Sequence, residues 1–223
     1  MKTAIISTCW LDKEDYLFKT AKFIKYYCQP QVMADLGISE KDIWFVDNAS
    51  SPESHDRLRA LIPDLYDKVS FKKYTKYYSR TAHLEYPYCW RALYFARDLF
   101  QEYDYDKVVS TNNDSFIISS KFANFIKEYK SGYWVPWCNK FHFPECEIQI
   151  ITKDNKSYWN MTATPYLEQN GKYMEVTIPA VVGMKFIGDR HSQDGIKEQQ
   201  PGWDYSTQVP MDMEIKYDTR LDH

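Results

Sequence analysis

Residues 107–116 read Lys-Val-Val-Ser-Thr-Asn-Asn-Asp-Ser-Phe. The first five form a short apolar run, typical of a strand that is buried on both faces of a sheet. Asn112, Asn113 and Asp114 follow it directly. Two oxygen-bearing side chains two residues apart on an extended segment project to the same side, so Asn112 and Asp114 could together hold Mg²⁺ or Mn²⁺. A plain Asn-Asn-Asp turn is the alternative, because these residues favour turns.

Strand and helix patterns alternate through residues 1–135. Pro30 is expected to close the first helix, and Ser50 with Glu53 has the spacing of a capping box that opens the second. Strands alternating with amphipathic helices predict an α/β fold with a doubly wound, mostly parallel sheet, whose ligands bind at the carboxyl ends of the strands. The expected strands are 3–8, 43–46, 69–74, 107–111 and 116–118, and the expected helices include 17–28, 88–99 and 122–129.

Residues 136–223 have a different pattern. The segment 147–152 alternates apolar and polar residues, and Asp154-Asn155 could turn it back. Asn170-Gly171 is a strong hairpin signal, and the chain from Gly188 onward is polar and punctuated by Gly and Pro. We therefore expect one domain, with a nucleotide-binding half over 1–135 and a loop-rich, antiparallel, acceptor-binding half over 136–223.

Composition excludes several classes of function. The chain carries 28 Lys and Arg against 31 Asp and Glu, a net charge of −3, so no general basic field attracts nucleic acid. No apolar run approaches the ~20 residues of a membrane span, and we expect a cytoplasmic protein. The five cysteines include no Cys-x-x-Cys pair. Cys138, His142 and Cys146 provide only three zinc ligands at an unusual spacing, which disfavours a zinc site.

Three short segments resemble the GT-A class of nucleotide-sugar glycosyltransferases, particularly the inverting family 2. They are Ile-Ile-Ser-Thr at 5–8, Val-Asp-Asn-Ala-Ser-Ser at 46–51 and Asn-Asn-Asp-Ser-Phe-Ile at 112–117. They occur in the order of that class, each at a strand end, and the resemblance covers roughly residues 3–120. The aromatic-rich chain, with 19 Tyr and only 7 Gly, also resembles small glycosyltransferases with which large DNA viruses decorate capsid proteins. A viral origin would imply the host cytoplasm.

The resemblance implies a hexosyl- or deoxyhexosyltransferase with a nucleoside-diphosphate sugar donor, a glycan or protein-linked acceptor, and Mn²⁺ or Mg²⁺. Asp47 would accept a hydrogen bond from a uracil or thymine base, which favours a UDP- or TDP-linked donor. Arg80 would contact the diphosphate or the base, although a solvated loop arginine is equally compatible with the sequence. At the position of Asn112 the class more often has Asp. The neutral amide of Asn112 lowers the negative charge of the metal ligands. The implied donor-binding residues are Thr8, Cys9, Asp47, Asn48, Arg80, Asn112 and Asn113, and the implied metal ligands are Asp114, Asn112 and His191.

An inverting transferase needs a carboxylate base that deprotonates the acceptor hydroxyl. Gly202-Trp203-Asp204 followed by Asp212-Met213-Glu214 is similar to the segment in which family 2 carries this base, and we favour Asp212, with Asp194 as the competitor. A late histidine reaches the metal in some retaining GT-A families, so a metal-bound His191 would weaken the inverting assignment. The indole rings that could form an acceptor platform are Trp134, Trp137, Trp159 and Trp203.

Other enzyme classes lack their motifs. The loop after the first strand contains no glycine, which argues against nucleotidyltransferases, and no Gly-x-Gly-x-x-Gly is present for a dinucleotide. A phosphatase with an Asp-x-Asp nucleophile would need aspartate at Asn112, and no Gly-x-Ser-x-Gly marks a hydrolase. One alternative of another class stays open, a non-catalytic module that binds carbohydrate or a nucleotide sugar.

Overall fold

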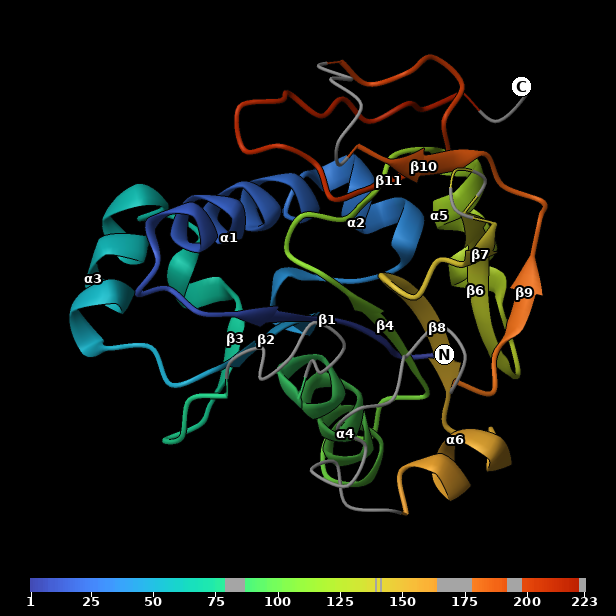
Figure 1. The fold of residues 1–223 in the computed structure, drawn as a ribbon, viewed down its shortest axis with the longest axis horizontal. Helices are drawn as coiled ribbons and strands as arrows, with labels where there is room; N and C mark the ends of the chain where they lie inside the picture. The colour runs from blue at the N-terminus through green and yellow to red at the C-terminus, as the bar shows by residue number, and fades with distance from the viewer. Residues whose placement is uncertain (79–86, 139, 141, 164–177, 192–197, 221–223) are drawn as a thin grey trace.

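The computed structural model describes residues 1–78, 87–138, 140, 142–163, 178–191 and 198–220. Its largest element is a mixed sheet with the strand order β3-β2-β1-β4-β8-β6-β7, in which β9 lies beside β6 (Figure 1). The strands of this sheet are β1 (Thr3–Cys9), β2 (Ile43–Asp47), β3 (Ser70–Lys73), β4 (Lys107–Thr111), β6 (Tyr133–Cys138), β7 (Phe143–Pro144), β8 (Ile148–Thr152) and β9 (Val181–Gly183).

The order of the strands creates a topological switch point between β1 and β4. Strands β3, β2, β1 and β4 run parallel, whereas β8 is antiparallel to β4 and to β6. The chain passes outward from β1 through β2 to β3 and then returns to form β4 on the other side of β1. Ligands of open α/β sheets bind at such a point, outside the carboxyl ends of the strands. The predicted doubly wound, mostly parallel sheet is confirmed.

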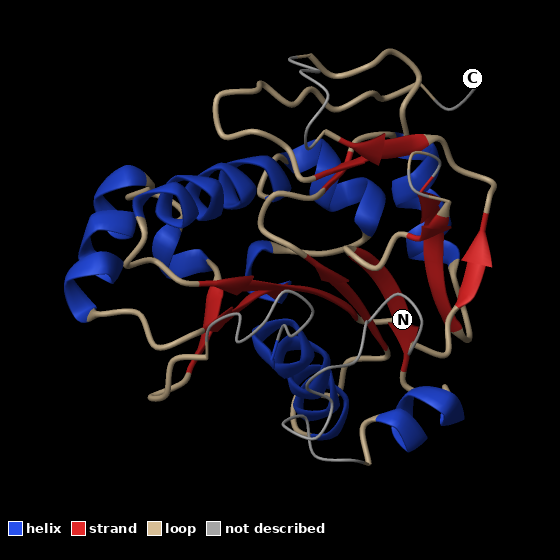
Figure 2. Ribbon diagram, in the orientation of Figure 1, coloured by secondary structure: helices blue, strands red, loops and turns tan. Residues whose placement is uncertain are grey.

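Helices cover both faces of the sheet (Figure 2). On β1, Ile5 packs with the apolar faces of α1, α2, α3 and α5, and its neighbours Ala4 and Ile6 pack with α4 and α6, because successive side chains of a strand point to opposite faces. Two 3₁₀ turns, Glu40–Asp42 and Tyr66–Lys68, precede β2 and β3. The helices are α1 (Glu14–Tyr27), α2 (Pro30–Leu36), α3 (Pro52–Leu61), α4 (Pro87–Gln101), α5 (Ser120–Glu128) and α6 (Lys156–Met161).

A second, three-stranded sheet joins the C-terminal part of the chain to the segment after β4. It contains β10 (Gly188–Arg190), β11 (Tyr205–Thr207) and β5 (Phe116–Ile117) in the order β10-β11-β5. Strand β11 is parallel to β10 and antiparallel to β5. The C-terminal residues therefore lie next to the turn formed by Asn112, Asn113 and Asp114.

The structure corrects four local expectations. Pro30 does more than end a helix, because it opens α2 at the position where proline suits a helix. Ser51, rather than Ser50, caps α3 by accepting a hydrogen bond from Ser54 N. Strand β8 is buried along its whole length instead of alternating, and Asn155 caps α6 rather than turning the chain back. The expected hairpin at 170–171 and its flanking strands lie outside the described residues.

Among the described residues, no helix combines the length and the apolar character needed to cross a bilayer.

Candidate active site

The loops that follow β1 and β2 are joined by hydrogen bonds. Cys9 pairs with Asp47 in the parallel register, and Asn48 N donates to Cys9 O at 2.9 Å. Further along, Leu11 N donates to Ser50 Oγ at 2.8 Å. These contacts fix the geometry of both loops at the carboxyl end of the sheet, where the expected nucleotide-binding residues Cys9, Asp47 and Asn48 lie together.

Asp47 is a buried carboxylate that shapes its own turn. It is 1% exposed, and its Oδ1 accepts hydrogen bonds from Ser50 N at 3.1 Å and Ser50 Oγ at 2.5 Å. His55 Nε2 lies 2.9 Å from Oδ2. Burial and the negative charge of Asp47 raise the pKa of the Cys9 thiol well above its usual value, which keeps Cys9 neutral. Direct contact of Asp47 with a base stays a prediction.

Asn48 and Arg91 hold the segment that follows β3. The Asn48 amide donates to Tyr78 O at 2.6 Å and accepts from Tyr78 N at 3.0 Å. Arg91, which is 1% exposed, donates to Asn48 Oδ1 at 2.9 Å, and its guanidinium lies 4.2 Å from the ring centroids of Tyr74 and Tyr78. Arg91 is therefore a packed arginine, and Asn48 positions the backbone around residue 78.

An aromatic ring that follows β1 packs against one that follows β3. The centroids of Trp10 and Tyr77 are 4.5 Å apart, Tyr77 is 42% exposed, and Trp10 is half-buried. Thr8, also half-buried, precedes them on the strand opposite Val46. Flat rings at a strand end provide a stacking surface for a nucleobase. Sequence analysis did not single out the Trp10–Tyr77 pair, because its two members are far apart in the chain.

The turn after β4 places a carboxylate beside a lysine of α1. Lys19 Nζ lies 2.7 Å from Asp114 Oδ2, and the two side chains are 25% and 17% exposed. Burial lowers the pKa of Lys19, but the adjacent Asp114 carboxylate outweighs it and the net pKa is raised. Asn113 is 5% exposed and its amide donates to Thr20 Oγ1 at 3.2 Å, so it is directed toward α1. Asn112 is half-buried and its N–H donates to Glu147 O at 3.2 Å.

Lys22 joins the same helix face to the segment that carries Asp212. Its Nζ donates to Pro210 O at 2.9 Å and to Met213 O. Burial lowers the pKa of Lys22 to about 8, with nearby Lys19 adding to the decrease and the charge of Asp212 opposing it. The exposed Asp212 is thus held close to α1, one turn along from the Lys19–Asp114 pair.

Two glutamates, Glu145 and Glu147, add further polar groups near these residues. Neither was identified from the sequence. Glu145, which is fully buried, accepts hydrogen bonds from Arg190 Nε at 2.7 Å and Nη2 at 2.9 Å. Glu147 accepts from Ser115 Oγ at 2.9 Å and from Gln208 Nε2 at 2.8 Å. No short motif marks these glutamates, because their surroundings come from β10, β11 and the turn after β4.

The Glu147 carboxyl has a strongly displaced pKa. Burial raises it from 4.5 to about 8, the charges of Glu145 and Asp114 add to the rise, and Arg190 opposes it. The folded chain therefore keeps a proton that the unfolded chain releases, so this group makes the free energy of unfolding decrease as the pH rises from about 4.5 to about 8.

We predict that Glu147→Gln raises the melting temperature by about 5 °C at pH 8 and changes it little at pH 5. The amide keeps the shape of the side chain and can still accept from Gln208, while the cost of ionising a buried carboxyl disappears. Thermal melts of both proteins at both pH values check this. An equal difference between variant and wild type at the two pH values would contradict it.

Three other residues were predicted for the site: His191, Arg80 and Asp194. His191 is 2% exposed, its backbone N–H donates to Thr207 O at 3.0 Å, and its ring lies 5.2 Å from that of Trp203. Arg80 and Asp194 lie outside the described residues. Within the described part of the chain, no group of three His, Cys, Asp or Glu side chains is placed to hold a metal ion.

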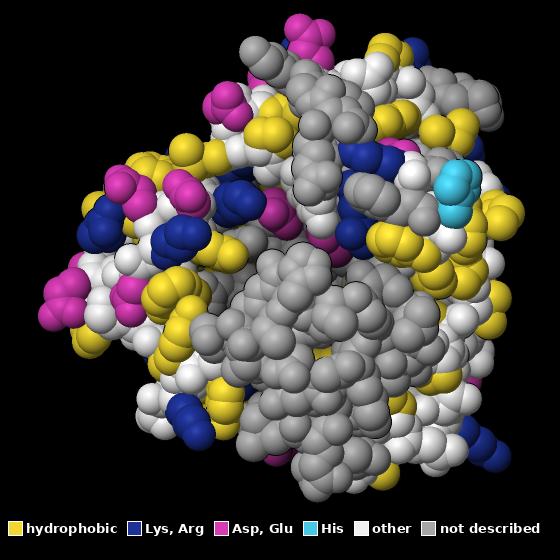
Figure 3. Space-filling view, in the orientation of Figure 1, with side chains coloured by type: hydrophobic (Ala, Val, Ile, Leu, Met, Phe, Trp, Pro, Cys, Tyr) yellow, Lys and Arg dark blue, Asp and Glu magenta, His cyan; other side chains and the backbone are white. Residues whose placement is uncertain are grey.

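The surface is hollowed at the carboxyl end of the sheet. Figure 3 shows a depression near the centre of this face, in the region through which the loop after β4 runs in Figure 1, with acidic and basic side chains at its rim. Ligands of open α/β sheets bind in a crevice of this kind, outside the carboxyl ends of the strands at the switch point.

No protein-family model and no curated protein matches the sequence. Among solved structures, the chain is similar to the galactosyltransferase LgtC in complex with donor and acceptor sugar analogues, at 11% identity and a TM-score of 0.51, over 93% of this chain and 86% of that one. A glycosyltransferase involved in glycosylation of the major capsid of PBCV-1 matches at 11% identity and a TM-score of 0.44, over 85% and 86% of the two chains. The mannosyltransferase PcManGT from Pyrobaculum calidifontis, in complex with GDP-Man and Mn²⁺, matches at 16% identity and a TM-score of 0.42, over 68% and 44%.

The similarity to LgtC is a similarity of fold. It extends over nearly the whole chain, so the predicted GT-A-like architecture is confirmed. At 11% identity it carries no information about individual residues.

Proposed function

We propose that this chain is a glycosyltransferase that moves a sugar from a nucleoside-diphosphate sugar, with UDP- and TDP-linked donors favoured, to a glycan or protein-linked acceptor. The observation that carries the proposal is the position of Asp114 and its lysine partner at the switch point of a GT-A-like sheet. The nucleoside would lie against the loop after β1, near Thr8, Cys9 and the rings of Trp10 and Tyr77. The diphosphate would lie at the amino-terminal side of the turn after β4.

We propose that a divalent cation is shared between the protein and the donor. Asp114 supplies a carboxylate and Asn112 an amide oxygen, and Mg²⁺ or Mn²⁺ sites that include substrate phosphates need only one or two carboxylates. Bound there, the cation would neutralise charge on the diphosphate leaving group. To bind the cation, Asp114 would have to give up its contact with Lys19. The Lys19 ammonium group would then be free to pair with a phosphate oxygen.

The acceptor hydroxyl needs a base on the side opposite the diphosphate if the reaction inverts the anomeric centre. Asp212 is exposed and lies on the segment whose carbonyls Lys22 binds, which keeps it close to α1. We propose Asp212 for this role. Proton NMR of the product tests the stereochemistry, and retention of the anomeric configuration would contradict it.

A non-catalytic module that binds nucleotide sugars is the second candidate function. It is favoured by the Lys19–Asp114 ion pair, which occupies the carboxylate of the proposed cation site. Such a module would bind the donor and leave it intact.

We expect UDP or TDP to raise the melting temperature of the protein by several degrees when Mn²⁺ is present. A ligand at 100 times its dissociation constant adds about 2.7 kcal/mol to the free energy of unfolding. The measurement is a thermal-shift panel with UDP, TDP, GDP and CMP, each with and without Mn²⁺. No shift with any nucleotide would overturn the proposed donor site.

A further inference from the structure

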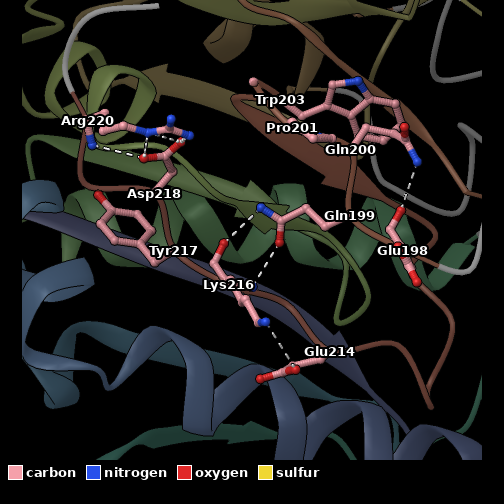
Figure 4. A pocket seen from close by; sticks show the side chains of 11 residues that line it. Glu198, Gln199, Gln200, Pro201, Trp203, Glu214, Lys216, Tyr217, Asp218 and Arg220 are labelled. Atoms are coloured by element: carbon pink, nitrogen blue, oxygen red, sulfur yellow. Dashed lines mark hydrogen bonds and ion pairs between the residues drawn. The ribbon is translucent and has the colours of Figure 1, made fainter.

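A second cavity lies in the C-terminal part of the chain, on the outer side of the segment that Lys22 holds. Its volume is about 540 Å³, within the ~300–1,000 Å³ range of small-molecule sites. Two segments line it, 198–203 and 214–220, and Figure 4 shows them facing each other. The donor-site residues at the ends of β1, β2 and β4 do not line this cavity.

A tight turn presents an aromatic ring at the cavity. Gln200 O accepts a hydrogen bond from Trp203 N at 3.4 Å, with Pro201 and Gly202 between them. Gly202 has φ = +78°, the value that the third position of a type II turn requires and that glycine adopts without strain. A Cβ added at Gly202 would meet no atom within 4 Å, so the space beside the turn is open.

A side-chain amide fixes the distance between the two segments. Gln199 accepts a hydrogen bond from Lys216 N at 2.8 Å and donates to Lys216 O at 2.9 Å (Figure 4). Next along the chain, the Tyr217 hydroxyl donates to Asp35 Oδ2 at 2.8 Å, which anchors that ring to α2. The rings of Trp203 and Tyr217 therefore line a preformed cavity together with Gln199.

The charges around the cavity nearly cancel. Lys216 Nζ lies 3.8 Å from Glu214 Oε2, and Arg220 Nη2 lies 2.6 Å from Asp218 Oδ2. With Glu198, the lining has three carboxylates and two cations. An anionic ligand would meet an excess of negative charge, whereas hydroxyl groups could both donate to the carboxylates and accept from the cations.

We propose that this cavity binds a neutral sugar unit, with one face of the pyranose on Trp203 and its hydroxyls on the polar side chains of segment 214–220. Aromatic faces suit the apolar face of a pyranose, and paired acidic and basic groups suit its hydroxyl edge. The inference deepens the proposed function. If the chain is a glycosyltransferase, the bound sugar is a unit of the acceptor glycan that is not itself modified, and this part of the inference rests on the proposed function. The ring of Trp203 also contacts the ring of His191, with 5.2 Å between the centroids.

The test measures sugar binding directly, without a donor. Saturation-transfer NMR on the full chain uses glucose, galactose, mannose and N-acetylglucosamine, with glucuronic acid as the anionic probe. We expect at least one neutral sugar to bind the wild type, Trp203→Ala to weaken that binding about tenfold, and Trp203→Phe to restore part of it. Trp44→Ala, which removes a half-buried indole on β2, is the matched control and should leave binding unchanged.

Three results would overturn the inference. They are that no neutral sugar binds the folded wild type, that Trp203→Ala binds as well as the wild type, and that glucuronic acid binds best. Melting curves establish that each variant is folded. The nucleotide panel on the wild type separates this inference from the proposed function: sugar binding that depends on Trp203, without any nucleotide binding, would support the cavity and reject the transferase.

Discussion

Replacing Asp114 by alanine is expected to lower the rate of donor turnover by about 100- to 1,000-fold. Asp114 is the carboxylate at the switch point, and we assign it to the cation that balances charge on the departing diphosphate. The substitution also breaks the ion pair with Lys19, but the two side chains are partly exposed and the pair contributes only about 1 kcal/mol or less to stability. The loss should therefore be one of activity, measured as nucleoside diphosphate released from a nucleotide sugar, with a melting temperature close to that of the wild type.

Asp98→Ala is the matched control for this prediction. Asp98 on α4 makes an ion pair of the same type with Lys72, at 3.6 Å, with similarly exposed side chains. Its removal should leave donor turnover unchanged. If Asp114→Ala kept turnover within about threefold of the wild type, the assignment of Asp114 would be wrong.

Arg190→Met is expected to destabilise the protein by about 3–5 kcal/mol, which lowers the melting temperature by about 10 °C. Glu145 is fully buried, and its bidentate partner is the Arg190 guanidinium. Without Arg190, the carboxylate keeps hydrogen bonds from Thr207 Oγ1 at 3.0 Å and Glu147 N at 3.1 Å but loses its countercharge. Removing one partner of a buried pair leaves an uncompensated charge, and that accounts for the size of the effect.

Two further variants make this prediction specific. Arg59→Met, which breaks the exposed contacts with Asp56 and Asp67, should cost about 1 kcal/mol or less. Adding Glu145→Gln to Arg190→Met should recover part of the lost stability, because the buried charge is then removed. Denaturant titrations provide the free energies. If Arg190→Met lowered the free energy of unfolding by less than about 1 kcal/mol, the Arg190–Glu145 pair would not be what holds β10 to the main sheet.

The first half of the fold could be predicted because its signals are local. In the sequence, a strand buried on both faces is recognised as a short apolar run. The polar residue that follows the run marks the end of the strand, as at Asp47 and Asn112. Parallel strands then bring distant ends to the same edge of the sheet. At that edge the structure places Cys9 opposite Asp47.

The missed features depend on tertiary contacts. The Lys19–Asp114 pair joins a helix to a turn, and the sequence gives no reason to select Lys19 among the polar residues of α1. Glu147 owes its raised pKa first to burial and then to the charges of Glu145 and of Asp114, and Asp114 reaches it from the turn after β4. Either Ser50 or Ser51 could cap α3. Ser51 does so, because the Ser50 hydroxyl donates its hydrogen bond to Asp47.

Release of a nucleoside diphosphate from nucleotide sugars tests the central claim most directly. The wild-type protein is incubated with UDP- and TDP-linked hexoses, with and without Mn²⁺, in the presence of neutral oligosaccharide acceptors, and the free diphosphate is quantified. The account predicts release that depends on Mn²⁺, that increases with acceptor and that is lost in Asp114→Ala. Binding of the same donors without any release would contradict it and identify the chain as a nucleotide-sugar-binding module.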